Sequence, residues 1–193
     1  MENSIQKFDR SDWFRLFLVC AFPLHLWTIL MVFRDVSWVA ERTTSWDALG
    51  FSGYALFYSL IESALLFGFI ALLSLLIPKS WNKILRFSIL GLLAFALAGW
   101  SIIEQLILIV FWGRLRNLAS SLSFLASTSW SAPLLFAGLV AISVAVPILL
   151  LRKHKKLQNA VFSILERLSL LSGLYLFLDV VGIVIIIFRN IKG

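Results

Sequence analysis

The chain has 193 residues, of which 61% are hydrophobic and only 14% charged, and its mean hydropathy is +0.95. Soluble domains carry about 25% charged residues, so this composition excludes an ordinary soluble protein and predicts an all-α integral membrane protein. The formal charge of +7 does not indicate nucleic-acid binding, because the basic residues lie between apolar stretches and form no face of their own.

Five stretches are long enough to cross a bilayer, which requires about 20 apolar residues at a rise of about 1.5 Å each. In chain order they are residues 14–33, 49–77, 84–112, 132–151 and 168–188. The apolar part of the first stretch exceeds that of a signal peptide, so we expect it to be retained as a span. The sequence thus predicts one transmembrane domain over residues 1–193, a bundle of about five helices.

Short amphipathic segments are expected at the membrane surfaces. Residues 36–47 and 115–125 should lie on the outer surface. Leu157, Val161, Leu165 and Leu168 form a helical stripe that should extend the fifth span into the inner interface. In the fourth span, Ala137, Ala141 and Ala145 form a ridge of small residues, for which we favour a contact inside the bundle over one with a partner chain.

The distribution of Lys and Arg predicts the orientation. The N-terminal tail and the alternate loops on its side hold eleven, against six on the opposite side. Positive charge favours the cytoplasm, so we expect the N-terminus inside and the C-terminus outside, in the cell (cytoplasmic) membrane. The run Arg152, Lys153, Lys155 and Lys156 is then a topology signal, with binding of anionic lipid headgroups as the alternative.

Titratable residues inside the spans are the main functional clue. A carboxylate in hydrocarbon costs about 2.5–3.5 kcal/mol on insertion scales, so an acid there needs a partner or a purpose. Three acids and one histidine lie in the spans, most of them near mid-depth, and tyrosines share a helical face with two of the acids. The candidate binding or proton-relay residues are therefore His25, Tyr54, Tyr58, Glu62, Glu104, Tyr175 and Asp179.

Two interpretations of these residues stay open. In the first, they bind protons, a cation or a small polar solute during transport, either alone or as part of a complex. In the second, the chain is a non-catalytic accessory or assembly subunit whose acids are structural or contact a partner membrane subunit. We expect Glu62 and Asp179 to point into the bundle and to approach each other or His25.

An enzyme is less favoured, and no cofactor or metal is identified. A catalytic zinc site usually has more than one histidine among its ligands, and only His25 lies within a span. Cys20, the single cysteine, shares a span with His25 but not a helical face, and no serine stands in a nucleophile motif.

Overall fold

The structure is a computed structural model that describes residues 8–106 and 131–192, and these residues form helices and no strand. The helices are α1 (Arg10–Arg42), α2 (Ser45–Leu73) with a short 3-10 turn η1 (Ser74–Leu76), α3 (Lys83–Leu106), α6 (Ser131–Lys153) and α7 (Lys155–Lys192). The all-helical class is thereby confirmed. Four helical segments, α1, α2 with η1, α3 and α7, are long and apolar enough to cross a membrane. The expected surface helix at 115–125 and the end of the third span lie outside the described residues.

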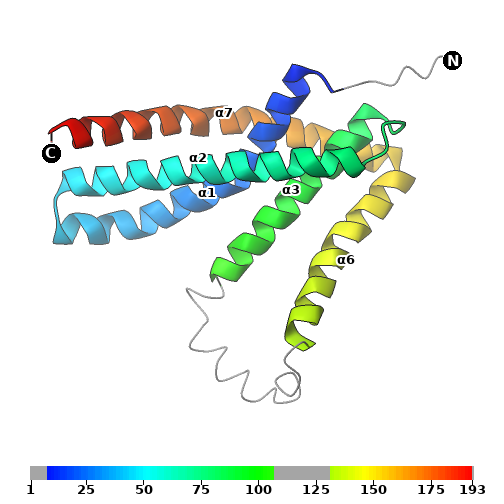
Figure 1. The fold of residues 1–193 in the computed structure, drawn as a ribbon, viewed down its shortest axis with the longest axis horizontal. Coiled ribbons are helices and arrows are strands. Elements are labelled where there is room, and N and C mark those ends of the chain that lie inside the picture. The colour runs from blue at the N-terminus through cyan, green and yellow to red at the C-terminus, as the bar shows by residue number, and fades with distance from the viewer. Residues whose placement is uncertain (1–7, 107–130, 193) are drawn as a thin grey trace.

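Helices α1, α2 and α7 lie side by side and contact one another, while α3 packs against α1 and α7 and carries α6 on its other side. Figure 1 shows that the start of α1, the α2–α3 connection and the α6–α7 junction lie at one end of the bundle. The α1–α2 turn and the end of α7 lie at the other end. We call these the N-terminal end and the C-terminal end of the bundle. Since α1 and α7 both begin at the N-terminal end, they run in the same direction.

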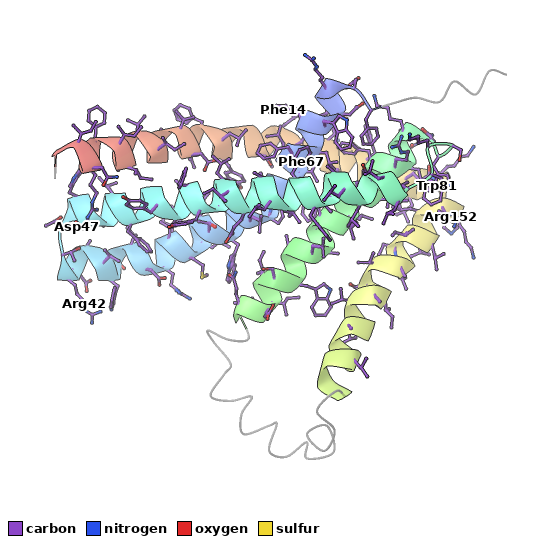
Figure 2. The ribbon with its side chains drawn as sticks, viewed as in Figure 1. Phe14, Arg42, Asp47, Phe67, Trp81 and Arg152 are labelled. Atoms are coloured by element: carbon purple, nitrogen blue, oxygen red, sulfur yellow. The ribbon has the colours of Figure 1, made fainter. Side chains whose placement is uncertain are left out.

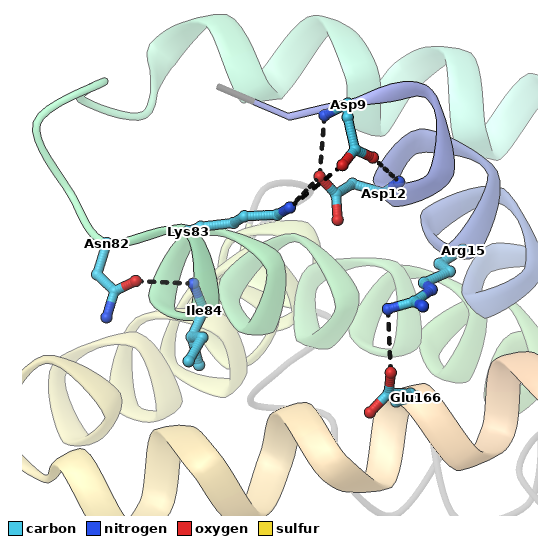
Figure 3. Close-up of polar contacts among 7 residues, drawn as sticks. All are labelled: Asp9, Asp12, Arg15, Asn82, Lys83, Ile84 and Glu166. Atoms are coloured by element: carbon cyan, nitrogen blue, oxygen red, sulfur yellow. Dashed lines mark hydrogen bonds and ion pairs between the residues drawn. The ribbon is translucent and has the colours of Figure 1, made fainter. Parts of the chain in front are cut away.

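Hydrogen bonds and ion pairs hold the start of α1 at the N-terminal end of the bundle (Figure 3). The carboxylate of Asp9 accepts from the backbone N–H of Asp12 at 2.8 Å, and the carboxylate of Asp12 accepts from the backbone N–H of Asp9 at 2.9 Å. These two hydrogen bonds cap α1. The hydrogen bond from Asp12 holds the pKa of the Asp9 carboxyl below its ordinary value. Lys83, at the start of α3, lies 2.6 Å from the Asp12 carboxylate. At the C-terminal end, Arg189 of α7 pairs with Asp47 of α2.

Aromatic and basic side chains meet at both ends, as Figure 2 shows for Trp81 with Arg152. The guanidinium of Arg152 lies 5.0 Å from the Trp81 ring centroid, and that of Arg42 lies 4.0 Å from the Trp38 ring. Between the ends, large apolar side chains face outward, for example Leu65 at 69% exposure. This arrangement is typical of a protein whose middle faces lipid and whose ends face headgroups.

Two helices are longer than the predicted spans. α1 continues past residue 33 to Arg42 and α2 begins at Ser45, so residues 36–47 form no segment of their own. Their location at the outer surface stays a prediction. Neither Gly nor Pro interrupts the chain there, and Thr44 caps the next helix by accepting from the Asp47 backbone N–H at 3.1 Å. The predicted helix N-terminal to residue 168 is present, because α7 begins at Lys155 and buries Leu165 against the core. Its location at the inner interface stays a prediction.

Small residues form the inward face of α2. Gly53, Ser59 and Ser63 are buried there, whereas the long side chains of α2 point mostly outward. A Cβ added to Gly53 would lie only 3.0 Å from the carbonyl oxygen of Gly182, so α2 and α7 approach at backbone distance. Gly182 thereby permits the close contact between these two helices.

The alanine ridge of α6 does not make the internal contact that its sequence suggested. Ala137, Ala141 and Ala145 are all exposed. The face toward α3 is a different one, where the Trp100 indole N–H donates to the Ser143 hydroxyl at 2.9 Å. Helical rotation of about 100° per residue separates the two faces, and the spacing of small residues alone does not say which face meets the bundle.

Candidate functional site

A histidine and an aspartate meet in the interior, between α1 and α7. The His25 Nε2 atom lies 3.0 Å from Oδ1 and 2.9 Å from Oδ2 of Asp179. His25 is 0% exposed and Asp179 is 2% exposed. The approach of Asp179 to His25 expected from their similar depth is thus observed.

Hydrogen-bond geometry fixes how many protons the pair carries. His25 Nδ1 lies 2.9 Å from the carbonyl oxygen of Ala21, and since a carbonyl only accepts, Nδ1 must hold a proton. The contact between Nε2 and the Asp179 carboxyl then requires one further proton, placed either on the histidine or on the aspartate. Both placements leave the pair with zero net charge. Losing that shared proton would leave an uncompensated buried negative charge.

Serines of α2 and an aromatic ring of α7 complete the surroundings of this pair. The Ser63 hydroxyl lies 3.4 Å from His25 Nδ1 and donates to the Ser59 carbonyl oxygen at 2.7 Å. The Tyr175 ring lies parallel to the imidazole, with 2° between the planes and 5.9 Å between centroids. These contacts orient the imidazole, and the hydrogen-bonded chain through Ser63 ends at a helix carbonyl, which cannot pass a proton onward.

Glu62 lies elsewhere, and the expectation that it points into the bundle is wrong. Its side chain is exposed and lines two grooves, of about 220 and 280 Å³, on the face formed by α1, α2 and α3. The physical reason is the helical phase, because its neighbour Ser63 takes the inward position and one residue turns the direction by about 100°. Within the described residues Glu62 makes no hydrogen bond or ion pair.

Tyr54 and Tyr58 of α2 have different neighbours. Tyr58 lines the smaller groove together with Glu62 and Gln105, whose carboxamide oxygen accepts from the Trp27 indole N–H at 2.6 Å. Tyr54 instead accepts a hydrogen bond from the Asn190 side chain of α7 at 3.2 Å. Tyr58 and Glu62 thus share a groove, whereas Tyr54 is paired with α7 and does not line it.

Glu104 and the basic run also lie apart from the pair. Glu104 is exposed near the end of the described part of α3. Arg152, Lys153, Lys155 and Lys156 are exposed at the α6–α7 junction, where His154 alone separates the helices. This junction is held by Gln158, whose side-chain N–H donates to the Leu151 carbonyl oxygen at 2.7 Å.

Sequence reasoning missed the serines. Ser59 and Ser63 are 1% and 0% exposed, and the Ser59 hydroxyl has no hydrogen-bond partner among the described residues. Their i, i+4 spacing, with Gly53 on the same side of α2, was the available signal for an inward polar face. The described residues hold no group of three or more His, Cys, Asp and Glu side chains that could bind a metal ion.

Comparison of the chain with protein-family models, with curated proteins and with solved structures gives no match. The function must therefore be inferred from the residues themselves. Two features bear on that inference: a buried, hydrogen-bonded His25–Asp179 pair, and a carboxylate, Glu62, left exposed at mid-helix.

Proposed function

We propose that the chain is an accessory or assembly subunit of a membrane complex, and that Glu62 binds a basic side chain on a membrane helix of a different protein. One observation carries the proposal: Glu62 is exposed about 26 Å along α2 from Ser45, in the middle of a helix long enough to span. A lone carboxylate facing lipid costs about 2.5–3.5 kcal/mol, and a cationic partner would offset this cost.

The neighbouring side chains support a partner on this face. Asp179 is already satisfied by His25, so the interior offers no comparable unpaired acid among the described residues. Glu62 stands in a groove with Tyr58 and Gln105, which supply further polar atoms around the carboxylate. No Lys or Arg lies near mid-depth in the apolar spans, so a second copy of this chain would supply no cation there.

The proposed threading has five spans, with α6 as the fourth, the N-terminus inside and the C-terminus outside the cell membrane. It rests on the distribution of Lys and Arg. In a background without Cys20, a membrane-impermeant thiol reagent should label Trp46→Cys from outside and leave Lys153→Cys unlabelled. Outside labelling at residue 153 would reverse the orientation.

Photo-crosslinking tests the partner. A photo-reactive amino acid at Leu65, which is 69% exposed and lines the groove beside Glu62, should give a discrete adduct with one other membrane protein. Glu62→Gln should lower the adduct yield about tenfold, because a charge-assisted hydrogen bond contributes about 1.5–3 kcal/mol. Glu62→Asp keeps the charge and should retain part of the yield.

The matched control is the same photo-reactive residue at Leu174 of α7, which is 61% exposed. It should give no discrete protein adduct, because that position lines neither groove. Equal adducts at both positions, or an unchanged yield in Glu62→Gln, would contradict the proposal. Two differently tagged copies of the chain joined in one adduct would show self-association and contradict a separate partner.

The His25–Asp179 pair favours a second candidate, a proton-binding role in transport. The pair shares one proton in a buried setting, and a second contact orients the imidazole. Against it, none of the grooves described here is lined by either residue. In this role, protein reconstituted in liposomes should conduct protons, and Asp179→Asn should abolish that flux. The accessory role predicts no flux in either protein.

A further inference from the structure

A groove of about 360 Å³ lies between the start of α1 and the first half of α7, near the N-terminal end of the bundle. Arg15 donates to the Glu166 carboxylate at 3.0 Å across these helices, as Figure 3 shows. This ion pair holds the two helices in register at this level. The groove contains neither the His25–Asp179 pair nor Glu62.

The side chains that line this groove change from polar to mainly apolar with depth. Six of the nine lining residues recur at i, i+4 and i+7: Ser11, Arg15 and Leu18 on α1, and Ser163, Arg167 and Leu170 on α7. Phe14, Glu166 and Ser169 complete the lining. Because α1 and α7 run in the same direction, both present a hydroxyl first, then a guanidinium, then an apolar side chain. A phospholipid has the same order, from polar headgroup through phosphate to acyl chain.

The guanidinium level agrees with a headgroup position. Arg15 precedes His25 by ten residues, or about 15 Å along α1. With His25 near the midplane of the proposed span, Arg15 stands at the edge of a hydrocarbon core about 30 Å thick. Phosphate groups lie just beyond that edge. Leu170 at 76% exposure offers apolar surface on the hydrocarbon side.

The groove has more positive than negative side chains, since Arg15 and Arg167 line it with Glu166. Glu166 neutralises part of the Arg15 charge, but Arg167 is exposed and makes no ion pair with a described residue. Two guanidinium groups against one carboxylate leave one positive charge, which matches the single negative charge of a phosphodiester. A guanidinium also offers paired donors that suit phosphate oxygens.

We propose that this groove binds one anionic phospholipid. Arg167 and the remaining donors of Arg15 hold its phosphodiester, the serine hydroxyls contact the headgroup, and an acyl chain lies over Leu18 and Leu170. The site is separate from the basic run at residues 152–156, and it needs the full lipid, since Leu18 and Leu170 line its inner part.

The test measures the unfolding temperature of the full chain in a neutral detergent while lipid is added. Phosphatidylglycerol should raise Tm in a saturable way, whereas phosphatidylcholine with the same acyl chains should not. Arg167→Gln should raise the half-saturating concentration of phosphatidylglycerol about tenfold, and Arg167→Lys by less, because it keeps the charge but loses the paired donors. Each variant is compared with its own lipid-free Tm.

Lys156→Gln is the matched control, because it removes the same charge from an exposed position of α7 outside the groove. It should leave the half-saturating concentration unchanged. Equal weakening by Lys156→Gln and Arg167→Gln would indicate diffuse attraction and overturn the proposal. So would an equal response to phosphatidylcholine. Glycerol 3-phosphate shifting Tm at the same concentration as the lipid would assign the groove to a free phosphate ester.

Discussion

Asp179→Leu should lower the free energy of unfolding by about 1–3 kcal/mol, the cost of leaving a buried hydrogen-bonding group without its partner. The reason is that His25 Nε2 lies 2.9 Å from the Asp179 carboxyl, with no solvent to replace this partner. The Nδ1 atom stays bound to the Ala21 carbonyl oxygen, so the imidazole cannot turn away without losing a second hydrogen bond. Denaturant unfolding of the purified protein in mixed micelles measures the loss.

Two further variants separate the pair from simple packing. Asp179→Asn should cost only about 1 kcal/mol, because the amide N–H can donate to Nε2 of a neutral His25 and so keeps one hydrogen bond. The double variant His25→Leu with Asp179→Leu should be more stable than the sum of the two single losses predicts, since it leaves no unpaired polar group. Strict additivity of the two losses would show that the pair is not coupled.

Gly182→Leu should separate α2 from α7 and destabilise the fold by about 1–3 kcal/mol or more, as overpacking does in well-packed interiors. A Cβ at residue 182 would lie 3.3 Å from both the Cα and the carbonyl oxygen of Gly53, and backbone atoms cannot move aside as a flexible side chain can. The same unfolding assay measures the loss. Weaker binding of α7 should also expose the nearby Arg189–Asp47 ion pair to faster local opening.

Gly173→Leu is the control for this substitution, because it lies on the same helix and a Cβ there meets nothing within 4 Å. It should leave stability unchanged or raise it slightly, since glycine is about 1 kcal/mol less favourable than alanine inside a helix and leucine is a good helix former. A loss at Gly173 as large as that at Gly182 would show that helix propensity or micelle contact, and not the α2–α7 approach, causes the effect.

The sequence by itself determined which segments form helices. Long apolar runs leave the backbone no way to satisfy its hydrogen bonds in hydrocarbon except as helices, and the described runs are helical. Depth along a helix also follows from residue counting, because the rise per residue is fixed. For this reason the sequence predicts that His25 and Asp179 lie at a similar depth, and the structure shows them in contact. The orientation in the membrane stays a prediction from the charge distribution.

Only the tertiary structure decided which way each side chain faces. Glu62 and Ser63 are neighbours of nearly equal depth, yet Ser63 lies buried beside His25 while Glu62 lies outside. The apolar stretches of α2 carry large residues on nearly every side, so hydrophobic periodicity cannot select the inward face. Close approach of backbones selects it instead, through Gly53 against Gly182. The groove lined by Arg15 and Arg167, which are 152 residues apart in sequence, likewise depends on the parallel packing of α1 and α7.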